Sequence, residues 1–297
     1  MSHNRTKQWA SDMSLGIRFA VGIVAITAAL LTVAIAQEPL RTAVDGTFAP
    51  HAMPRMDGGV EGFNVDLANA IGARLGRKVD IKAAQFSGLI PGLQAGTYDF
   101  LAAPTTVNEE RANNLLFSEG FMDTNFAFVV RKADAAAYKN LDDFRGKTIA
   151  VNRGSAYDMY LKSKADEYKW KIESYGTNTD AVAAVLARRA DAALAGNTVS
   201  AWAVKQTPGL ALSYEIKTGL VWALPLRKDN AALRDRIDRA LECLKLDGTM
   251  ARLSEKWFGV KPESGTTIVT PTPGYGVPGM AGFVPDDHKP SCDNLSL

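Results

Sequence analysis

The segment from Phe86 to Arg111 constrains the fold more than any other stretch, and it reads FSGLIPGLQAGTYDFLAAPTTVNEER. Its first apolar residues have helical spacing, and Gly96 then marks a helix end. Residues 98–103 follow as a short buried strand. Asn108 is a candidate N-cap for a helix that carries two glutamates and Arg111 in its first turn. The segment therefore predicts a helix, a strand and a second helix in close succession.

The turn after this strand also has the residue types of an anion site. Thr106 offers a hydroxyl, Arg111 offers a planar fork of donors that fits a carboxylate, and the start of a helix offers free backbone N–H groups. A capped surface helix with an exposed arginine is the alternative. On the local pattern alone, both interpretations stay open.

Short apolar strands and helices alternate along most of the chain, which favours βαβ units and mostly parallel sheets. The alternation occurs in two sets, so we expect two sheets and two lobes. The predicted strands are residues 40–44, 79–83, 148–151, 171–175 and 191–195, and the predicted helices include residues 65–75, 157 onward, 179–189 and a helical run over 231–258.

Length and composition agree with two lobes. The chain has 297 residues, of which 46% are hydrophobic and 22% charged, enough to bury two ordinary cores. The net charge is +2 and no basic run is interleaved with aromatic residues, so no nucleic-acid partner is expected. The three histidines form no cluster with ligand spacing, so neither a metal nor a cofactor is expected.

The N-terminus predicts export. Arg18 precedes an apolar segment over residues 19–35, and Ala34 and Ala36 fit the small-residue pattern before a signal-peptide cleavage site. We expect residues 1–36 to be a signal peptide that is cleaved after Ala36, which predicts a periplasmic protein. A retained membrane anchor is the alternative, since the apolar segment has about the minimum length for a span.

The two cysteines, Cys243 and Cys292, predict a disulfide if the protein is exported, because an isolated pair is usually bridged in an oxidising compartment. The alternative is a buried Cys243 and a free thiol in the tail. Residues 263–297 are rich in Pro, Gly and Thr, which predicts an extended and weakly ordered strap unless the bridge ties it down.

Six segments, in the same order, resemble those of family 3 extracellular solute-binding proteins, the amino-acid receptors of ABC importers. The resemblance covers about residues 40–260. Its segments are, in chain order, LRTAVDGTFAPHAM, GFNVDLANAIGARLG, FSGLIPGLQAGTYDFLAAPTTVNEER, LDDFRGKTIAVNRGSAYD, ADAALAGNTVSAW and LRKDNAALRDRIDRALECLKLDGTMARLSEKWFG.

The resemblance implies an α/β fold of the type II periplasmic binding proteins, in which two lobes are joined by a two-strand hinge. The hinge strands would be residues 125–130 and 219–226. It also implies that a monomer captures a carboxylate-bearing polar ligand, an amino acid or a derivative, by hinge closure and delivers it to an inner-membrane permease. The implied parts are residues 37–127 for lobe 1, 128–220 for lobe 2, 221–262 for the return to lobe 1 and 263–297 for the tail.

The resemblance assigns ligand-binding roles to residues of both lobes. Arg111 would hold the carboxylate beside the Thr106 hydroxyl and the Pro104 carbonyl, and the start of a lobe 2 helix would add backbone N–H groups. The aromatic walls would be two phenylalanines, for which core packing is the alternative. Asp45, at the end of the first strand, lines the site or else caps the following turn. The full set is Asp45, Phe48, Phe86, Pro104, Thr106, Arg111, Gly154, Ser155, Ala156 and Asn197.

The chain departs from the family at Gly196. Relatives that bind α-amino acids usually place an aspartate there to receive the ammonium group, whereas Gly196 and the next residue, Asn197, carry no charge. Either another acid such as Asp45 or Asp158 serves, or the ligand lacks a free α-ammonium. Arg153 is a candidate second cation, or a solvated surface residue.

An enzyme on the same fold, similar to the cyclohexadienyl dehydratases, is the alternative function. Such an enzyme needs a general acid beside the bound carboxylate. The implied site positions offer no histidine and no pair of carboxylates. We therefore expect a binding protein without catalytic residues.

Overall fold

A computed structural model describes residues 37–293 of the chain, and the described residues from Pro39 onward belong to one compact unit. The predicted signal peptide with its cleavage after Ala36, and the alternative membrane anchor, lie outside the described residues. Among the helices of the described part, none combines the length and apolarity needed to cross a membrane.

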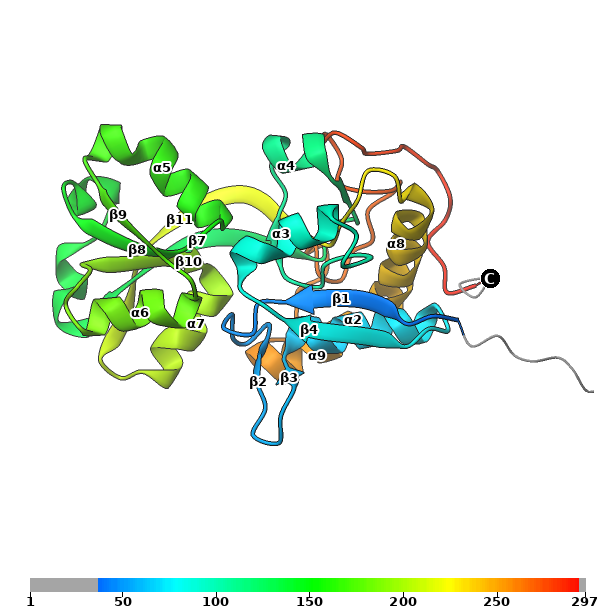
Figure 1. Cartoon of the computed structure of the whole chain (residues 1–297), viewed down its shortest axis with the longest axis horizontal. Coiled ribbons are helices and arrows are strands. Elements are labelled where there is room, and N and C mark those ends of the chain that lie inside the picture. The colour runs from blue at the N-terminus through cyan, green and yellow to red at the C-terminus, as the bar shows by residue number, and fades with distance from the viewer. Residues whose placement is uncertain (1–36, 294–297) are drawn as a thin grey trace, which may run out of the picture. The chain divides into compact units, whose positions relative to one another are not determined.

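Lobe 1 is built around a parallel pair of strands, β1 and β4, with α2 as the crossover helix between them (Figure 1). A small hairpin of β2 and β3 precedes α2, and α3 follows β4. The bounds are β1 (Leu40–Val44), β2 (Met53–Pro54), β3 (Val60–Glu61), α2 (Phe63–Arg74), β4 (Val79–Ala83) and α3 (Phe86–Gln94). The predicted strands over 40–44 and 79–83 are confirmed.

The predicted strand over residues 98–103 was wrong as a regular strand. Backbone hydrogen bonds join the segment to a neighbour on each side, but they do not form a continuous ladder. Leu101 N–H donates to the Pro225 carbonyl, and the N–H groups of Ala102 and Ala103 both donate to the Ala43 carbonyl. It is nevertheless fully buried from residue 100 to 103. The apolar run therefore correctly predicted burial, while the sharing of one carbonyl interrupts the strand pairing.

Lobe 2 contains three parallel strands, β8, β9 and β10, joined by helices α5 and α6. They belong to a six-stranded sheet of order β5-β11-β7-β10-β8-β9, in which β5 is Thr105–Thr106, β7 is Met122–Arg131 and β11 is Leu210–Ala223. The bounds are η2 (Lys132–Ala137), η3 (Leu141–Phe144), β8 (Thr148–Asn152), α5 (Ala156–Tyr168), β9 (Lys171–Tyr175), α6 (Asn178–Leu186), β10 (Ala192–Gly196) and α7 (Asn197–Gln206).

Two long antiparallel strands, β7 (Met122–Arg131) and β11 (Leu210–Ala223), run from one lobe to the other (Figure 1). They make the lobe 2 sheet mixed rather than wholly parallel, because β7 is also antiparallel to β10. The second crossing strand begins at Leu210, well before the predicted 219–226. Its apolar pattern is irregular because the pairing with β7 shifts register at two places.

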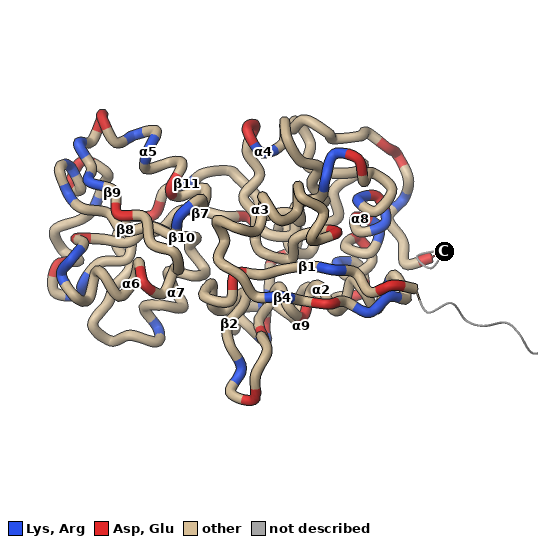
Figure 2. Tube along the Cα trace, viewed as in Figure 1, with Lys and Arg blue, Asp and Glu red and all other residues tan. Residues whose placement is uncertain are grey.

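The C-terminal helices pack back onto lobe 1. The helical run over 231–258 divides into α8 (Ala231–Leu246) and α9 (Thr249–Phe258), and both contact α2. The remaining elements of lobe 1 are β5 (Thr105–Thr106), α4 (Glu109–Asn114), β6 (Leu116–Phe117) and β12 (Pro225–Leu226). Figure 2 shows acidic and basic residues interspersed along the traces of both lobes, as the small net charge suggests.

The tail packs against lobe 1, where it provides partners for buried charges of α8. The Lys245 ammonium, fully buried, pairs with Glu119 at 2.8 Å and donates to the Thr270 carbonyl at 3.1 Å. The Asp238 carboxyl accepts from Gly276 N–H at 2.7 Å. Burial raises the pKa of both carboxyls. The prediction of a weakly ordered tail without a bridge missed these contacts, because composition does not reveal buried charges on another element.

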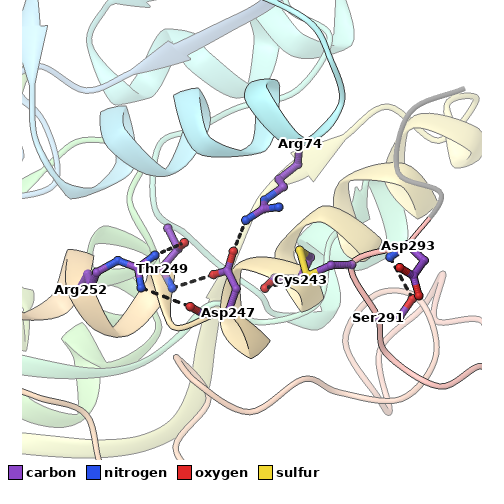
Figure 3. Close-up of a disulfide and its surroundings, with 8 residues drawn as sticks. Arg74, Cys243, Asp247, Thr249, Arg252, Ser291 and Asp293 are labelled. Atoms are coloured by element: carbon purple, nitrogen blue, oxygen red, sulfur yellow. Dashed lines mark hydrogen bonds and ion pairs between the residues drawn. A yellow bond between two sulfur atoms is a disulfide. The ribbon is translucent and has the colours of Figure 1, made fainter.

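A disulfide joins Cys243 of α8 to Cys292 of the tail (Figure 3). Beside it, Asp247 forms an ion pair with Arg74 and accepts from Thr249 N–H at 2.8 Å. Although the two sulfurs and Asp247 lie close together, the disulfide leaves no thiolate to act as a metal ligand.

We expect loss of this disulfide to destabilise the protein. Replacing both Cys243 and Cys292 by serine should lower the free energy of unfolding by about 2–4 kcal/mol, because the bridge closes a long loop and constrains the unfolded chain. Urea unfolding with and without reductant measures this. Reductant should shift the wild-type midpoint and leave that of the double variant unchanged; equal midpoints for wild type and variant would contradict the prediction.

Candidate ligand-binding site

Arg111 is held at the start of α4 by a local motif. The Asn108 side chain caps the helix by accepting from Arg111 N–H at 2.9 Å, as predicted. Arg111 is 6% exposed, and its guanidinium donates through Nη1 to the Thr106 carbonyl at 2.9 Å and through Nη2 to the Gly154 carbonyl of lobe 2 at 3.1 Å. Burial lowers the pKa of Arg111 to about 10, so it remains charged at neutral pH. The alternative of an exposed surface arginine is therefore excluded.

Phe86, the first residue of α3, packs over the charged group of Arg111. Its ring centroid lies 5.6 Å from Arg111 Cζ, within the range of a cation–π contact. The Phe86 side chain is itself buried. It therefore contacts Arg111 directly and limits the orientations that the guanidinium can take.

The turn before α5 brings lobe 2 to this site. Gly154 has φ of +74°, a conformation that favours glycine, and Ser155 caps α5 through its side chain. Two of the three N–H groups predicted to face a ligand have partners within lobe 2. Gly154 N–H donates to Asp158 at 2.9 Å, and Ser155 N–H donates to the Asn152 carbonyl at 3.3 Å. Ala156, at the first position of the helix, has no intrahelical acceptor for its N–H.

The carboxylate of Asp158 accepts a hydrogen bond from this turn. One oxygen accepts from Gly154 N–H and from the Lys162 ammonium, and the other accepts from the Ser174 hydroxyl at 2.8 Å. Burial disfavours the charged form, but these hydrogen bonds outweigh it and lower the pKa of Asp158. Both oxygens therefore have partners within lobe 2.

Asp45 combines the two roles expected for it. Its Oδ1 atom accepts from the backbone and the hydroxyl of Thr47, at 2.9 and 2.7 Å, which closes the turn after β1. Its Oδ2 atom accepts from Asn152 Nδ2 of lobe 2 at 2.8 Å. The side chain is 2% exposed and faces the same cavity as Arg111.

The two lobes enclose a cavity at this point. The cavity volume is about 10 Å³, roughly the room of one water molecule. Nine of the ten predicted residues meet here. Eight of them line the cavity, and the carbonyl of the ninth, Gly154, accepts a hydrogen bond from Arg111. The lining residues are Asp45, Phe48, Phe86, Ala103, Pro104, Thr106, Arg111, Asn152, Ser155, Ala156 and Tyr157.

Asn197 does not join this cavity, which corrects its predicted place. It begins α7 and lines a second cavity of about 310 Å³, together with Pro50, Trp202, Trp257 and others. The reason is geometric: the residue after Gly196 turns away as β10 gives way to the helix. Arg153 is also outside the Arg111 cavity, since it is exposed and donates to the Ser174 carbonyl at 2.9 Å.

Sequence reasoning missed two aromatic residues at this site: Tyr157 lines the cavity, and Trp222 contacts the lining residues Phe48 and Thr106. Tyr157 stacks on Phe48 with centroids 6.5 Å apart, and Trp222 meets Phe48 edge-on at 6.2 Å. The Trp222 indole N–H donates to the Thr106 hydroxyl at 3.1 Å, and the ring is fully buried. Burial raises the pKa of Tyr157, which keeps its hydroxyl neutral. No local pattern marked these residues, because their neighbours come from other parts of the chain.

The structure accounts for the glycine at position 196. A Cβ atom there would lie 2.6 Å from Trp222 Cζ2 and 2.8 Å from the Tyr157 hydroxyl, closer than real Cβ contacts. Any larger side chain would have to displace both rings. The indole of Trp222 therefore occupies the space beside Thr106 that a side chain at position 196 would need.

His51 links the lobes from a fully buried position. Its Nδ1 atom lies 2.8 Å from Asn64 Oδ1, and its Nε2 atom 2.8 Å from the Thr198 hydroxyl of lobe 2. Because Asn64 donates through Nδ2 to the Ala102 carbonyl, its oxygen faces His51 and accepts from Nδ1–H. Nε2 is then the acceptor for Thr198. Burial lowers the pKa of His51 to about 4.

Comparison with known proteins gives a consistent family match. The family described as bacterial extracellular solute-binding proteins, family 3, matches residues 40–260. A Bacillus subtilis protein named "Probable amino-acid-binding protein YxeM" is 34% identical over 68% of this chain and 77% of its own length. The ABC transporter arginine-binding protein 1 of Escherichia coli is 27% identical over 80% of this chain and 97% of its own length.

Solved structures agree with the fold. An ancestral arginine-binding protein bound to arginine has a TM-score of 0.72 and 34% identity, and covers 75% of this chain and 100% of its own. An ancestral amino-acid-binding protein described as a precursor of cyclohexadienyl dehydratase has a TM-score of 0.68 and 29% identity, and covers 74% of this chain and 95% of its own.

The burial of His51 predicts a specific pH dependence of stability. Between about pH 6.5, where an ordinary histidine titrates, and about pH 4, the unfolded chain binds more protons than the folded chain. The free energy of unfolding should therefore fall as the pH falls through this window, by on the order of 3 kcal/mol from this residue. His51→Gln should remove that part of the decrease. Urea unfolding at several pH values measures it, and parallel curves for variant and wild type would contradict the assignment.

Proposed function

Because this chain belongs to the bacterial extracellular solute-binding proteins of family 3, we propose that it captures a small carboxylate-bearing ligand and delivers it to the permease of an ABC importer. The ligand class is an amino acid or an amino-acid derivative. The names of its relatives, which include amino-acid-binding and arginine-binding proteins, support a solute of this size and polarity.

The observation that carries the proposal is the place of Arg111. A buried guanidinium without a carboxylate partner is costly. Among residues 37–293, Arg111 has no ion pair with a carboxylate: its guanidinium donates to two carbonyls and faces a cavity. A ligand carboxylate would supply the missing charge through two parallel hydrogen bonds. The Thr106 hydroxyl, which already accepts the indole N–H, can donate its own hydrogen to the same carboxylate.

Hinge closure is the proposed mode of capture. Hydrogen bonds tie the lobes together around the cavity: Arg111 to Gly154, Asn152 to Asp45, Asn178 N–H to the Thr47 hydroxyl, and Thr198 to His51. The enclosed volume takes about one water molecule, so a ligand of amino-acid size enters only if the lobes separate. The crossing strands β7 and β11 are the natural hinge, and periplasmic binding proteins are a known class of hinge-closing proteins.

We propose binding without turnover. Among the residues described as lining the cavity, Asp45 is the one carboxylate and there is no imidazole, so a matched acid and base pair is not provided. The alternative function is an enzyme similar to cyclohexadienyl dehydratase, because one similar solved structure is a precursor of that enzyme. That precursor is itself described as an amino-acid-binding protein. Conversion of prephenate or arogenate by the purified protein would favour the enzyme.

The proposed setting is the periplasm, reached by a signal peptide that is cleaved after Ala36. A monomer suffices for this function, because one chain supplies both sides of the cavity. The structural disulfide between Cys243 and Cys292 fits an oxidising compartment.

A thermal-shift screen of the mature protein tests the function. Amino acids, betaines, opines and dicarboxylates are the compounds to screen, since a ligand at about 100 times its dissociation constant stabilises the folded state by about 2.7 kcal/mol. At least one carboxylate should raise the melting temperature. A complete absence of shifts would count against a solute-binding role.

Arg111→Lys should weaken binding of that carboxylate at least about 100-fold, because the planar two-donor fork is lost and hydrogen bonds to charged groups contribute about 1.5–3 kcal/mol each. Isothermal titration calorimetry measures the change. Arg153→Lys is the matched control, since Arg153 precedes Gly154, whose carbonyl accepts from Arg111, but lies outside the cavity. Equal affinities for wild type and Arg111→Lys would remove the assigned anchor.

A further inference from the structure

A second cavity lies between the lobes, apart from the cavity that holds Arg111. Its volume is about 310 Å³, which is within the range of small-molecule sites. Helix α7 and strand β11 line it from lobe 2, and the end of α9 lines it from lobe 1; both helices lie in the lower half of Figure 1. Among residues 37–293, none lines both this cavity and the one at Arg111.

One face of α7 forms a side of this second cavity. Asn197, Ala201 and Lys205 are spaced four residues apart, so they follow one another along the same face of the helix. The two polar residues lie about 12 Å apart along the helix axis, at 1.5 Å per residue. The small side chain of Ala201 leaves the space between them open. This side of the cavity therefore has a polar group at each end and an apolar middle.

The other sides of the cavity are aromatic and apolar. Trp202 of α7, and Trp257 and Phe258 at the end of α9, supply three aromatic rings. Leu212 is 44% exposed and Val260 is 59% exposed, and they are two of the six large hydrophobic residues that are exposed in the described part of the chain. Single exposed apolar residues are ordinary, whereas apolar residues that gather at a hollow mark a binding groove. These sides fit a flat apolar ring.

The charges at the cavity favour an anion. The Lys205 ammonium lies 6.0 Å from the ring centroid of Trp202, and Lys205 forms no ion pair among residues 37–293. Glu215 also lines the cavity, but its Oε1 atom already accepts from Asn125 Nδ2 at 2.7 Å and from the Lys217 ammonium at 2.6 Å. The charge that lacks a counter-charge is therefore positive, and a ligand carboxylate can pair with it.

The amide of Asn197 has hydrogen-bonding capacity that the described residues do not use. Its side chain forms no hydrogen bond among residues 37–293, although its Oδ1 atom is buried. Buried polar atoms without a partner are rare and call for one. A hydroxyl both donates and accepts, so it fits either end of the amide. This end of α7 therefore suits a hydroxyl at the opposite end of the ring from the carboxylate.

We infer that this cavity is a second ligand site, which binds a small hydroxyaryl carboxylate. The ring packs against Trp202 of lobe 2 and Trp257 of lobe 1, the carboxylate pairs with Lys205, and the ring hydroxyl binds Asn197. The site goes beyond the proposed function and does not rest on it, because its residues are separate from those of the Arg111 cavity.

Compounds that differ in one group provide the test. 4-Hydroxyphenylacetate is titrated calorimetrically into the purified protein, in parallel with three analogues. Phenylacetate lacks the hydroxyl, 4-hydroxyphenylethanol lacks the charge, and 2-(4-hydroxyphenyl)ethylamine reverses it. We expect 4-hydroxyphenylacetate to bind at least about 10-fold more tightly than the alcohol or the amine, and more tightly than phenylacetate. Equal affinities for the carboxylate and the amine, or no binding of the carboxylate, would overturn the inference.

Three variants test the assigned residues. Lys205→Gln should weaken binding of 4-hydroxyphenylacetate about 10-fold, and Trp202→Ala at least as much, because the counter-charge or the stacking surface is lost. Asn197→Ala should remove the advantage of 4-hydroxyphenylacetate over phenylacetate. Lys171→Gln is the matched control, since Lys171 is an exposed lysine of β9 outside the cavity. An equal loss in Lys205→Gln and Lys171→Gln would contradict the site. If Trp202→Ala does not fold, the exposed Lys205→Gln change still decides.

Arg111→Lys separates the second site from the first. It should retain the binding of 4-hydroxyphenylacetate that depends on Lys205. Loss of this binding in Arg111→Lys would place the compound in the Arg111 cavity, which overturns the second site while the proposed function stands. If carboxylates fail to bind at Arg111 but 4-hydroxyphenylacetate still binds through Lys205, the proposed function fails alone. Dimerisation that Trp202→Ala abolishes in analytical ultracentrifugation would show that a second copy covers the cavity, and would also overturn the inference.

Discussion

The contact on which the site depends is the pair of hydrogen bonds from the Arg111 guanidinium to the Thr106 and Gly154 carbonyls, one in each lobe. Arg111 is 6% exposed, and a buried charged group must be surrounded by oriented acceptors, so the turns that carry these carbonyls are fixed in direction. The left-handed conformation of Gly154 and the side-chain cap of Ser155 place the lobe 2 turn accordingly. The same guanidinium is the proposed partner of a ligand carboxylate.

Around this contact, the strands β7 and β11 connect two lobes that meet at one cavity. The polar bonds across it involve single side chains and backbone groups, such as Asn152 to Asp45 and Thr198 to His51, which separate at little cost when water can replace them. One apolar cluster continues from lobe 1 into lobe 2, along the crossing strands and through the contact of Phe48 with Tyr157.

The tail provides hydrogen-bond partners for buried side chains of α8. Helix α8 carries Asp238 and Lys245 on a buried face, where each needs partners, and the tail supplies backbone groups to both. The disulfide to Cys292 then anchors the tail beyond these contacts. The family match ends at residue 260, so the tail lies outside the residues that the match covers.

The sequence by itself determined the alternating α/β order, the Asn108 cap and the position of Arg111 after a buried segment, because these depend on local spacing and capping. The resemblance to a family extended this to nine of the ten proposed site residues. Only the tertiary structure decided the role of Trp222. Its indole comes from a strand whose register shifts hide it from periodicity, and it meets Thr106 and Gly196 from distant parts of the chain. The glycine looked like a missing aspartate; packing shows that its space is occupied by another side chain.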